Sequence, residues 1–365
     1  MENLREEEVI FLSDVDKKKT GYEKYKEKFK RYFNDYKIST CEEEKSRIIN
    51  NVIDIYYKEK IFPMLYLPKK DIERDIVNLS KKNVVITNNI LNTKINAGNR
   101  ACKNVVKNIY KAKGTGRGTN GELSTFATRK LLFRTIKFVM KNNSVPTPTA
   151  IRGAFALTSG SVQNFLPIRA KAIYEHFTKD GDVVYDFSAG FGGRMIGAIC
   201  SDKDITYIGI EPNSETYVNL NKLKGIAEEV LNKQGKIKLY KNVSEEFELP
   251  EESVDFAFSS PPYFNVEIYT DEETQCYNRF REYESWLNGY VYPTMINIKK
   301  ALKTGGKVAV NVANSKKYNI FDDWKTICED IGLQYVDTIY FQLSGDNLEQ
   351  RKKSEGIMIF EKNKK

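Results

Sequence analysis

Two short stretches in the second half of the sequence combine residue types that can bind a nucleoside. The first reads Asp186-Phe-Ser-Ala-Gly-Phe-Gly-Gly-Arg194, and the second, Gly209-Ile-Glu211-Pro212, follows it at the spacing of adjacent βαβ strands, about 20 residues. Glycines permit a tight turn in which a ligand approaches the backbone, and the Glu211 carboxylate can accept both hydroxyls of a ribose. The pattern predicts a nucleoside pocket whose candidate contacts are Asp186, Ser188, Ala189, Gly190, Gly192 and Glu211.

The acidic residue before the glycines distinguishes between two kinds of nucleoside ligand. A dinucleotide-binding GxGxxG turn would have its third glycine at position 195, where this sequence has Met195. Asp186, at the expected end of a strand, would repel a pyrophosphate but attract a ligand with a cationic amino-acid end. S-Adenosylmethionine has such an end, so these residues favour it over NAD as the cofactor.

A third stretch, Phe258-Ser-Ser-Pro-Pro-Tyr-Phe264, follows a later apolar run and has the groups needed to hold an amine. The two prolines fix the backbone and lack N–H donors, so neighbouring carbonyl groups stay available. An amine on a nucleobase is a poor nucleophile until acceptors bind its two hydrogens, and the hydroxyl and carbonyl of Ser260 can be those acceptors. Positioning and electrostatics can carry such a transfer without a general base. The catalytic candidates are Ser260, Pro261, Pro262 and Tyr263, the last as a surface on which a base stacks.

Taken together, DFSAGFGGR, GIEP and SSPPYF resemble the S-adenosylmethionine-dependent amino-methyltransferases of DNA, which modify adenine at N6 or cytosine at N4. The resemblance covers about residues 160–365 and implies a flipped base in the Ser260–Tyr263 pocket, facing the methyl group of the donor. It also implies that Phe165 packs against the donor's methionine end. Many adenine-specific members have Asp in place of Ser260, so the serine favours cytosine as the target. Members with Ser modify either base, however, and adenine and cytosine both remain possible targets.

The three motifs lie at the expected ends of strands in an α/β domain. From about residue 164, short apolar segments alternate with helices, and the expected strands are 182–187, 206–210, 237–241, 254–259, 307–313, 334–343 and 356–361. Connections of this length predict a seven-stranded, mostly parallel, Rossmann-like sheet with helices on both faces. The last two strands lack a helix between them and should form an antiparallel hairpin. Ligands of such sheets bind at the carboxyl ends of the strands.

The N-terminal part is expected to be a separate, mainly helical region. Two prolines in SVPTPTA (144–150) mark a boundary, so the expected domains are 1–150 and 151–365. Residues 81–170 contain 16 Lys and Arg but one acid, in a chain of net charge +9. This excess predicts contact with nucleic acid. The candidate contacts lie in a glycine-rich loop and in a basic helix over 129–143; they are Lys111, Lys113, Arg117, Arg129, Lys130 and Arg134.

Composition argues against several other kinds of chemistry. A single histidine, His176, and five scattered cysteines do not supply a zinc site, so no metal is expected. None of the cysteines follows a proline, which argues against cytosine-C5 methylation. The absence of CxxC pairs and of an apolar run of about 18 residues favours a cytoplasmic protein without a signal peptide or membrane helix.

The function that these residues predict is DNA methylation, DNA being the expected partner. No nuclease motif accompanies the modification motifs, so a modification enzyme without its own restriction activity is the simplest interpretation. An RNA methyltransferase of the same fold is the first alternative, because a basic region serves RNA as well. Methylation of a glutamine amide in a protein, and a catalytically silent nucleic-acid-binding module, are the others. The oligomeric state is not predicted.

Overall fold

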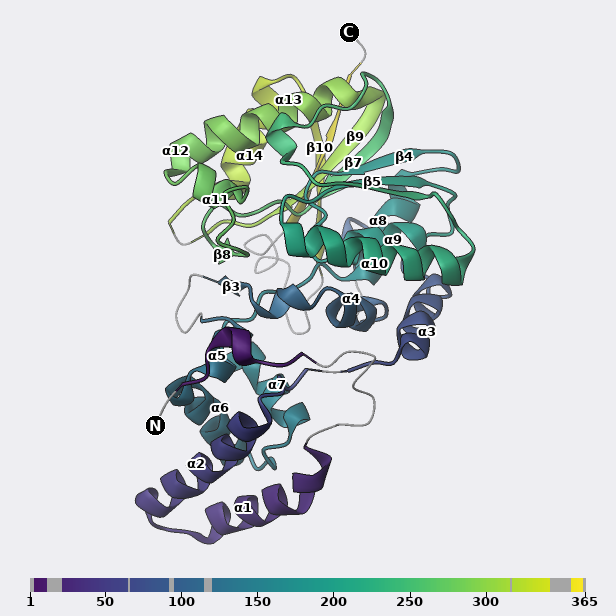
Figure 1. Ribbon diagram of the computed structural model, residues 1–365. Helices are drawn as coiled ribbons and strands as arrows, with labels where there is room; N and C mark the ends of the chain where they lie inside the picture. Colours follow the sequence, from purple (N-terminus) through teal and green to yellow (C-terminus); the bar gives the residue numbers. More distant parts are fainter. Residues whose placement is uncertain are drawn as a thin grey trace. The chain divides into compact units, whose positions relative to one another are not determined.

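The computed structural model describes residues 3–11, 22–64, 66–91, 95–114, 120–315, 317–341 and 356–363. The chain divides into two units, of which the first is Met1–Lys69 with Lys107–Gln163 and the second is Lys70–Val106 with Asn164–Lys365 (Figure 1). The boundary expected near residue 150 therefore falls after residue 163, and residues 70–106 belong to the second unit. The basic segment 81–170 is shared between the two units.

The first unit is mainly helical, as its periodicity predicts. Its aromatic core includes Phe62, whose ring centroid lies 5.6 Å from that of Phe126 and 5.8 Å from that of Phe155. Pro148 begins a helix at a position where its missing N–H is not needed. The elements are η1 (Glu6–Glu8), η3 (Glu23–Tyr25), α1 (Lys26–Ile38), α2 (Glu42–Glu59), η4 (Lys107–Tyr110), β3 (Lys113–Gly114), α5 (Glu122–Ala127), α6 (Arg129–Lys141) and α7 (Pro148–Thr158).

The second unit has the predicted alternation of strands and helices. Its elements before the sheet core are α3 (Lys69–Ser80), β1 (Ile86–Thr87), β2 (Ile90–Leu91), α4 (Asn99–Val105) and α8 (Pro167–Phe177). Those that follow are β4 (Val183–Asp186), α9 (Gly193–Ile199), β5 (Thr206–Ile210), α10 (Ser214–Leu231), β6 (Ile237–Tyr240), η5 (Ser244–Glu246), β7 (Val254–Ser259), β8 (Glu267–Ile268), α11 (Cys276–Arg279), α12 (Tyr283–Trp286), η6 (Leu287–Val291), α13 (Tyr292–Ala301), β9 (Leu302–Val312), α14 (Ile320–Asp330), β10 (Gln334–Phe341) and β11 (Gly356–Glu361).

The sheet confirms the expected α/β fold, with a correction to its strand count. The order is β1-β2-β10-β11-β9-β7-β4-β5-β6. Strands β4 to β7 and β9 pair in parallel, whereas β11 is antiparallel to both of its neighbours, β9 and β10. The described sheet has nine strands rather than seven, because a short hairpin adds two strands, β1 and β2, of two residues each. Strand β2 pairs with β10. The turn residues of this hairpin, Asn88 and Asn89, have φ values of 48° and 57°, typical of a tight hairpin turn.

Helices cover both faces of this sheet. In Figure 1, α8, α9 and α10 lie on one side of it, and α13 and α14 lie on the other. The core on the second side includes Trp286, Met295 and Trp324, all fully buried. This arrangement leaves the ends of the strands as the accessible part of the sheet, as in other sheets covered by helices on both faces.

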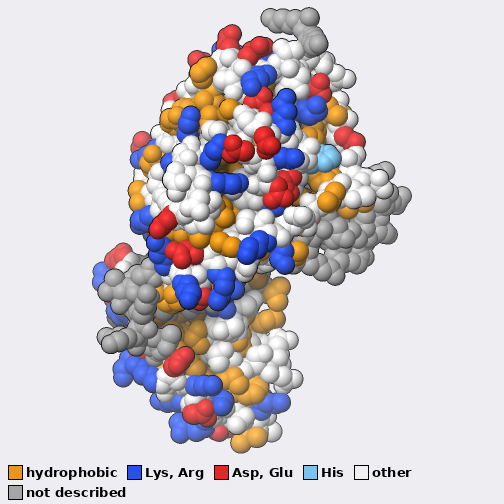
Figure 2. Space-filling view, turned by 90° about the vertical axis from the view of Figure 1, so that its right-hand side faces the viewer, with side chains coloured by type: hydrophobic (Ala, Val, Ile, Leu, Met, Phe, Trp, Pro, Cys, Tyr) orange, Lys and Arg blue, Asp and Glu red, His pale blue; other side chains and the backbone are white. Residues whose placement is uncertain are grey.

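The structure bears on membrane helices, metal-binding clusters and the single histidine, which the composition raised. Within the described ranges, no helix is long and apolar enough to cross a membrane. The same residues include no cluster of three or more His, Cys, Asp or Glu side chains arranged to hold a metal ion. His176 is exposed on α8 (Figure 2).

Candidate functional site

The three predicted motifs meet at one edge of the sheet. Strands β7, β4 and β5 are neighbours, and the register pairs Asp186 with Gly209 and Tyr185 with Ala257. Because the three strands are parallel, the residues that follow them emerge on the same side. The glycine turn, Glu211 and the Ser260–Tyr263 segment therefore come from adjacent strand ends, where sheets of this kind bind ligands.

Asp186 is completely buried and its carboxylate is bound by the chain itself. Its Oδ2 accepts from Arg194 Nε at 2.8 Å and from the Tyr207 hydroxyl at 2.7 Å. Its Oδ1 accepts from the Ser259 hydroxyl at 2.8 Å and from the Ser188 N–H at 3.2 Å. The sequence predicts that this acid attracts a cationic ligand, but in the structure the cation next to it is Arg194. Asp186 thus organises the turn and joins it to β7.

Three of these partners are not among the candidate residues that the sequence indicates. Arg194 follows the glycines and donates a further bond from Nη2 to the Ser188 carbonyl. Its position after the glycines of the turn is a sequence signal for pairing with Asp186, because a buried cation needs a carboxylate nearby. Tyr207 and Ser259 carry no such signal, since each is one polar residue in an apolar strand.

The glycine turn requires residues without side chains. Gly190 and Gly192 have φ values of 56° and 84°, a left-handed conformation that favours glycine. A Cβ atom on Gly193 would lie 1.8 Å from the carbonyl oxygen of Phe165. The Phe165 ring, half-buried, packs edge-on against Phe258 at 5.3 Å. Phe165 is therefore next to the turn, whose Ala189 N–H donates to the carbonyl of Ile210 at 2.8 Å.

Glu211 makes direct contact with the turn. Its Oε2 accepts from the Gly190 N–H at 3.0 Å, and its Oε1 accepts from the Asn213 N–H at 2.9 Å. The side chain is 7% exposed. Burial raises the pKa of Glu211 to about 8, against the lowering effect of these two backbone donors. The site therefore holds a carboxyl group that changes its charge near neutral pH.

The Ser260–Tyr263 segment lies partly exposed beside this turn. Ser260 Oγ and the Tyr263 hydroxyl are 3.0 Å apart, and the Tyr263 hydroxyl lies 3.5 Å from Oδ1 of Asn311. The next residue, Phe264, has a φ of 55°, which is an outlier for an aromatic residue. Its ring is buried, with centroids 5.3 Å from Tyr318 and 5.4 Å from Tyr283. This packing holds the strained end of the segment.

A π-helical turn brings another tyrosine to the site. The helical segment between residues 283 and 301 is divided into α12, the π-helical η6 and α13. Tyr290 lies in η6, is buried, and its hydroxyl is 3.3 Å from Ser188 Oγ. Such π turns often occur at functional sites. The helical periodicity of the sequence does not reveal this local change.

The candidate nucleic-acid contacts are in different environments. Lys111, Lys113, Lys130 and Arg134 are exposed, the last two on α6. Arg129 is instead bound to α2, because its guanidinium lies 2.7 Å from Asp54 and 3.2 Å from Asn50 and its side chain is 13% exposed. Arg117 lies outside the described residues. The exposed cations of α6 are therefore the best defined part of the basic surface.

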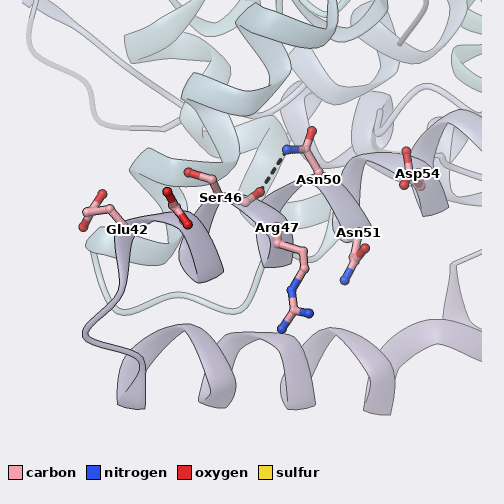
Figure 3. A pocket seen from close by; sticks show the side chains of 7 residues that line it. Glu42, Ser46, Arg47, Asn50, Asn51 and Asp54 are labelled. Atoms are coloured by element: carbon pink, nitrogen blue, oxygen red, sulfur yellow. Dashed lines mark hydrogen bonds between the residues drawn. The ribbon is translucent and has the colours of Figure 1, made fainter.

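A polar groove on α2 contains none of the predicted site residues. Its volume is about 560 Å³, and Figure 3 shows its lining of acidic, amide and hydroxyl side chains with one arginine. Asn50 donates to the Ser46 carbonyl within it at 3.0 Å. Its lining residues are Glu42, Glu43, Ser46, Arg47, Asn50, Asn51 and Asp54. Its acidic character does not suit a phosphate backbone.

No protein-family model matches the sequence, and no curated protein is significantly similar to it. Solved structures do resemble part of the chain. A methyltransferase from Pyrococcus furiosus is 17% identical, with 55% of this chain and 84% of that chain covered and a TM-score of 0.36. A TehB-like SAM-dependent methyltransferase from Corynebacterium glutamicum is 13% identical, with coverages of 63% and 98% and a TM-score of 0.36.

A third similar structure is TrmN from Thermus thermophilus. It is 16% identical, with 54% of this chain and 49% of TrmN covered and a TM-score of 0.37. This chain therefore spans about half the length of TrmN. Identity and overlap at these levels do not transfer an activity or a substrate to this chain.

Proposed function

We propose that this chain is a DNA methyltransferase that moves a methyl group from S-adenosylmethionine to the exocyclic amino nitrogen of adenine (N6) or cytosine (N4). The observation that carries the proposal is that the glycine turn, Glu211 and the Ser260–Tyr263 segment lie at the ends of the neighbouring strands β4, β5 and β7. Gly190 donates to Glu211, and Ser259 donates to Asp186 at 2.8 Å, directly before Ser260. A nucleoside-binding turn and an amine-binding segment therefore share one buried hydrogen-bond network.

The residues of the turn fit the proposed cofactor. The left-handed glycines leave the backbone accessible, and the buried Glu211 carboxylate stands where a ribose diol would be bound. Gly190, Gly192, Ser188 and Ala189 would line the nucleoside, and Phe165 would contact its amino-acid end. When bound, S-adenosylmethionine supplies an electrophilic methyl group. In this proposal Asp186 acts through Arg194 and the turn, since its oxygens are already hydrogen-bonded.

The segment after β7 would hold the acceptor base. Ser260 Oγ and the Ser260 carbonyl are oriented by the rigid Pro261–Pro262 step and can accept the two hydrogens of an amine. Binding those hydrogens localises the nitrogen lone pair and directs it away from the ring. Tyr263, half-buried, would contact the face of the base. The proton that the amine loses goes to solvent.

The exposed cations of α6 support nucleic acid as the substrate class. Lys130 and Arg134 are one helical turn apart and form no ion pair with any described residue. Cations in such a stripe contact phosphates without reading sequence. The same surface suits RNA, so RNA methylation stays the alternative and is an arm of the test.

The test is transfer of labelled methyl from S-adenosylmethionine to duplex DNA, single-stranded DNA and RNA, followed by nucleoside digestion and mass spectrometry. We expect N6-methyldeoxyadenosine or N4-methyldeoxycytidine from the wild type. Ser260→Ala should lower turnover about 10²–10³-fold, the range for removing one positioned group that stabilises a transition state, with unchanged cofactor affinity by calorimetry. Ser253→Ala, which removes a hydroxyl that binds the Pro250 carbonyl, is the matched control.

Three other outcomes are informative. Label in RNA alone would replace DNA by RNA as the substrate. Full activity of Ser260→Ala would remove the segment after β7 from the reaction. Cofactor binding without label in any nucleic acid would contradict the proposed activity and favour the silent binding module.

A further inference from the structure

We propose that Asn311 is a positioning residue that makes Ser260 a pure hydrogen-bond acceptor and so selects amines over keto oxygens at the target position. The proposal rests on the proposed function, because it concerns the same segment. Asn311 is completely buried in β9, and its Oδ1 lies 3.5 Å from the Tyr263 hydroxyl of the segment. Its effect on the target would therefore pass through Tyr263.

The sheet register brings Asn311 to this place. Strands β7 and β9 are parallel neighbours, and Ser259 pairs with Val310. Asn311 is the next residue, and so it lies opposite the start of the Ser260–Tyr263 segment. On its other side, β9 pairs with β11, where Gly356 stands opposite Val312. Asn311 is thus between the segment and the last strand.

The amide of Asn311 has one favourable orientation. Its Nδ2 lies 3.1 Å from the carbonyl oxygen of Gly356. A flipped amide would place Oδ1 against that oxygen, and two acceptors would then face each other in a buried site, at a cost of about 1–3 kcal/mol. Nδ2 therefore donates to Gly356, and Oδ1 is the atom that faces the Tyr263 hydroxyl.

This orientation decides the direction of the next two hydrogen bonds. An amide oxygen only accepts, so the Tyr263 hydroxyl uses its single hydrogen toward Asn311. In the 3.0 Å contact between Ser260 and Tyr263, either oxygen is placed to donate. Because the tyrosine hydrogen is already used, Ser260 is the donor in this pair. The lone pairs of Ser260 then remain for the target.

A Ser260 that only accepts distinguishes two classes of base. Adenine and cytosine present an N–H₂ group, which can donate one hydrogen to the Ser260 hydroxyl oxygen and the other to the Ser260 carbonyl oxygen. Thymine and uracil present a keto oxygen, which would face acceptors and lose its hydration without a partner. Sites built to hydrogen-bond one such group reject the analogue that lacks it. The chain Gly356–Asn311–Tyr263–Ser260 therefore sets the polarity of the target pocket.

The test is a double-mutant cycle in the methyl-transfer assay, with Asn311→Leu, Tyr263→Phe and the double variant, at saturating cofactor and mixed-sequence DNA. We expect Asn311→Leu to lower kcat about tenfold, the factor for one hydrogen bond, and to leave cofactor affinity unchanged. In the Tyr263→Phe background the same change should have no further effect, because its route to Ser260 is already absent. Asn311→Asp should recover activity when its carboxyl group is protonated, since that group then donates to the Gly356 carbonyl and still accepts from Tyr263.

A second measurement does not depend on the folding of Asn311 variants. Wild type and Tyr263→Phe are compared for binding to oligonucleotides whose target amine is replaced by a keto group, as in hypoxanthine for adenine or uracil for cytosine. We expect the wild type to discriminate against the keto base at least tenfold and Tyr263→Phe to lose most of that discrimination. Equal binding of both bases by the wild type overturns the inference.

The cycle also separates this inference from the proposed function. A wild type that methylates no nucleic acid contradicts both. A wild type that methylates DNA, with losses from Asn311→Leu and Tyr263→Phe that multiply in the double variant, contradicts only the role of Asn311, because independent effects multiply.

Discussion

Two buried carboxyl groups at the proposed cofactor site are stabilised in different ways. Asp186 has a guanidinium partner and two hydroxyl donors, whereas the donors to Glu211 among the described residues are two backbone N–H groups. Burial without a cation in contact raises the pKa of Glu211 to about 8. At neutral pH the unliganded site therefore carries much of Glu211 in its protonated form.

This residue-scale difference predicts a pH dependence of stability. Between the ordinary pKa of 4.5 and the raised value of about 8, the folded chain keeps a proton that the unfolded chain releases. The contribution of Glu211 to the free energy of unfolding therefore falls as pH rises through this window. Glu211→Gln should remove that fall, so urea unfolding of both proteins between about pH 5 and pH 9 should give curves that diverge.

The control is Glu251→Gln, which changes an exposed carboxylate in the same unit. Its stability should follow the wild type across the range. Parallel curves for wild type and Glu211→Gln would show that Glu211 titrates at the same pH in the folded and unfolded chain.

At the scale of elements, the site depends on how closely α9 approaches α8 and the segment before it. A Cβ on Gly193 would lie 1.8 Å from the Phe165 carbonyl oxygen, and one on Gly197 would lie 2.5 Å from Cβ of Ala170. Such close approaches cannot be relieved by moving a flexible side chain. The two glycines of α9 therefore set the distance between the glycine turn and Phe165.

Gly193→Ala should push these elements apart. We expect a loss of stability of about 1–3 kcal/mol, the usual range for overpacking, and weaker cofactor binding, measured by urea unfolding and calorimetry. Gly225→Ala on α10 is the matched control, because nothing lies within 4 Å of the added Cβ. It should raise stability by about 0.5–1 kcal/mol, since alanine favours a helix over glycine. A harmless Gly193→Ala would show that the packing against Phe165 is loose.

At the scale of the whole molecule, the positive charge is unevenly distributed along the chain. The sixteen cations of residues 81–170 are divided between the two units. On the face shown in Figure 2, acidic and basic side chains are interspersed. Binding to nucleic acid should therefore depend on local stripes such as that on α6 and less on the net charge of +9.

Charge reversal tests this distinction. Lys130→Glu with Arg134→Glu should weaken DNA binding and lower the slope of log K against log salt by about 2, close to one for each phosphate that the protein no longer neutralises. Lys28→Glu with Arg31→Glu, on the exposed face of α1, changes the net charge equally and should leave the slope nearly unchanged. Equal effects of the two pairs would mean that net charge, and not the stripe, attracts DNA.

The local elements and the places of the motifs could be predicted from the amino-acid sequence. Strands 206–210, 254–259 and 356–361 have the bounds that their apolar runs predict. The glycine turn, Glu211 and Ser260–Tyr263 follow strands as expected, because apolar periodicity and turn residues act over a few neighbouring positions. The parallel sheet with its antiparallel strand also followed from the lengths of the connections.

Contacts between distant parts of the chain establish which residues complete the site and where the chain divides into two units. A π turn brings Tyr290 to the site and the register of β7 and β9 brings Asn311 there, and neither of these features leaves a local sequence pattern. The hairpin at Asn88 and Asn89 joins the sheet although each of its strands has two residues. The physical reason is the same in each case: a buried polar group or a strand edge is satisfied by whatever the fold brings beside it, and that partner lies far away in the sequence.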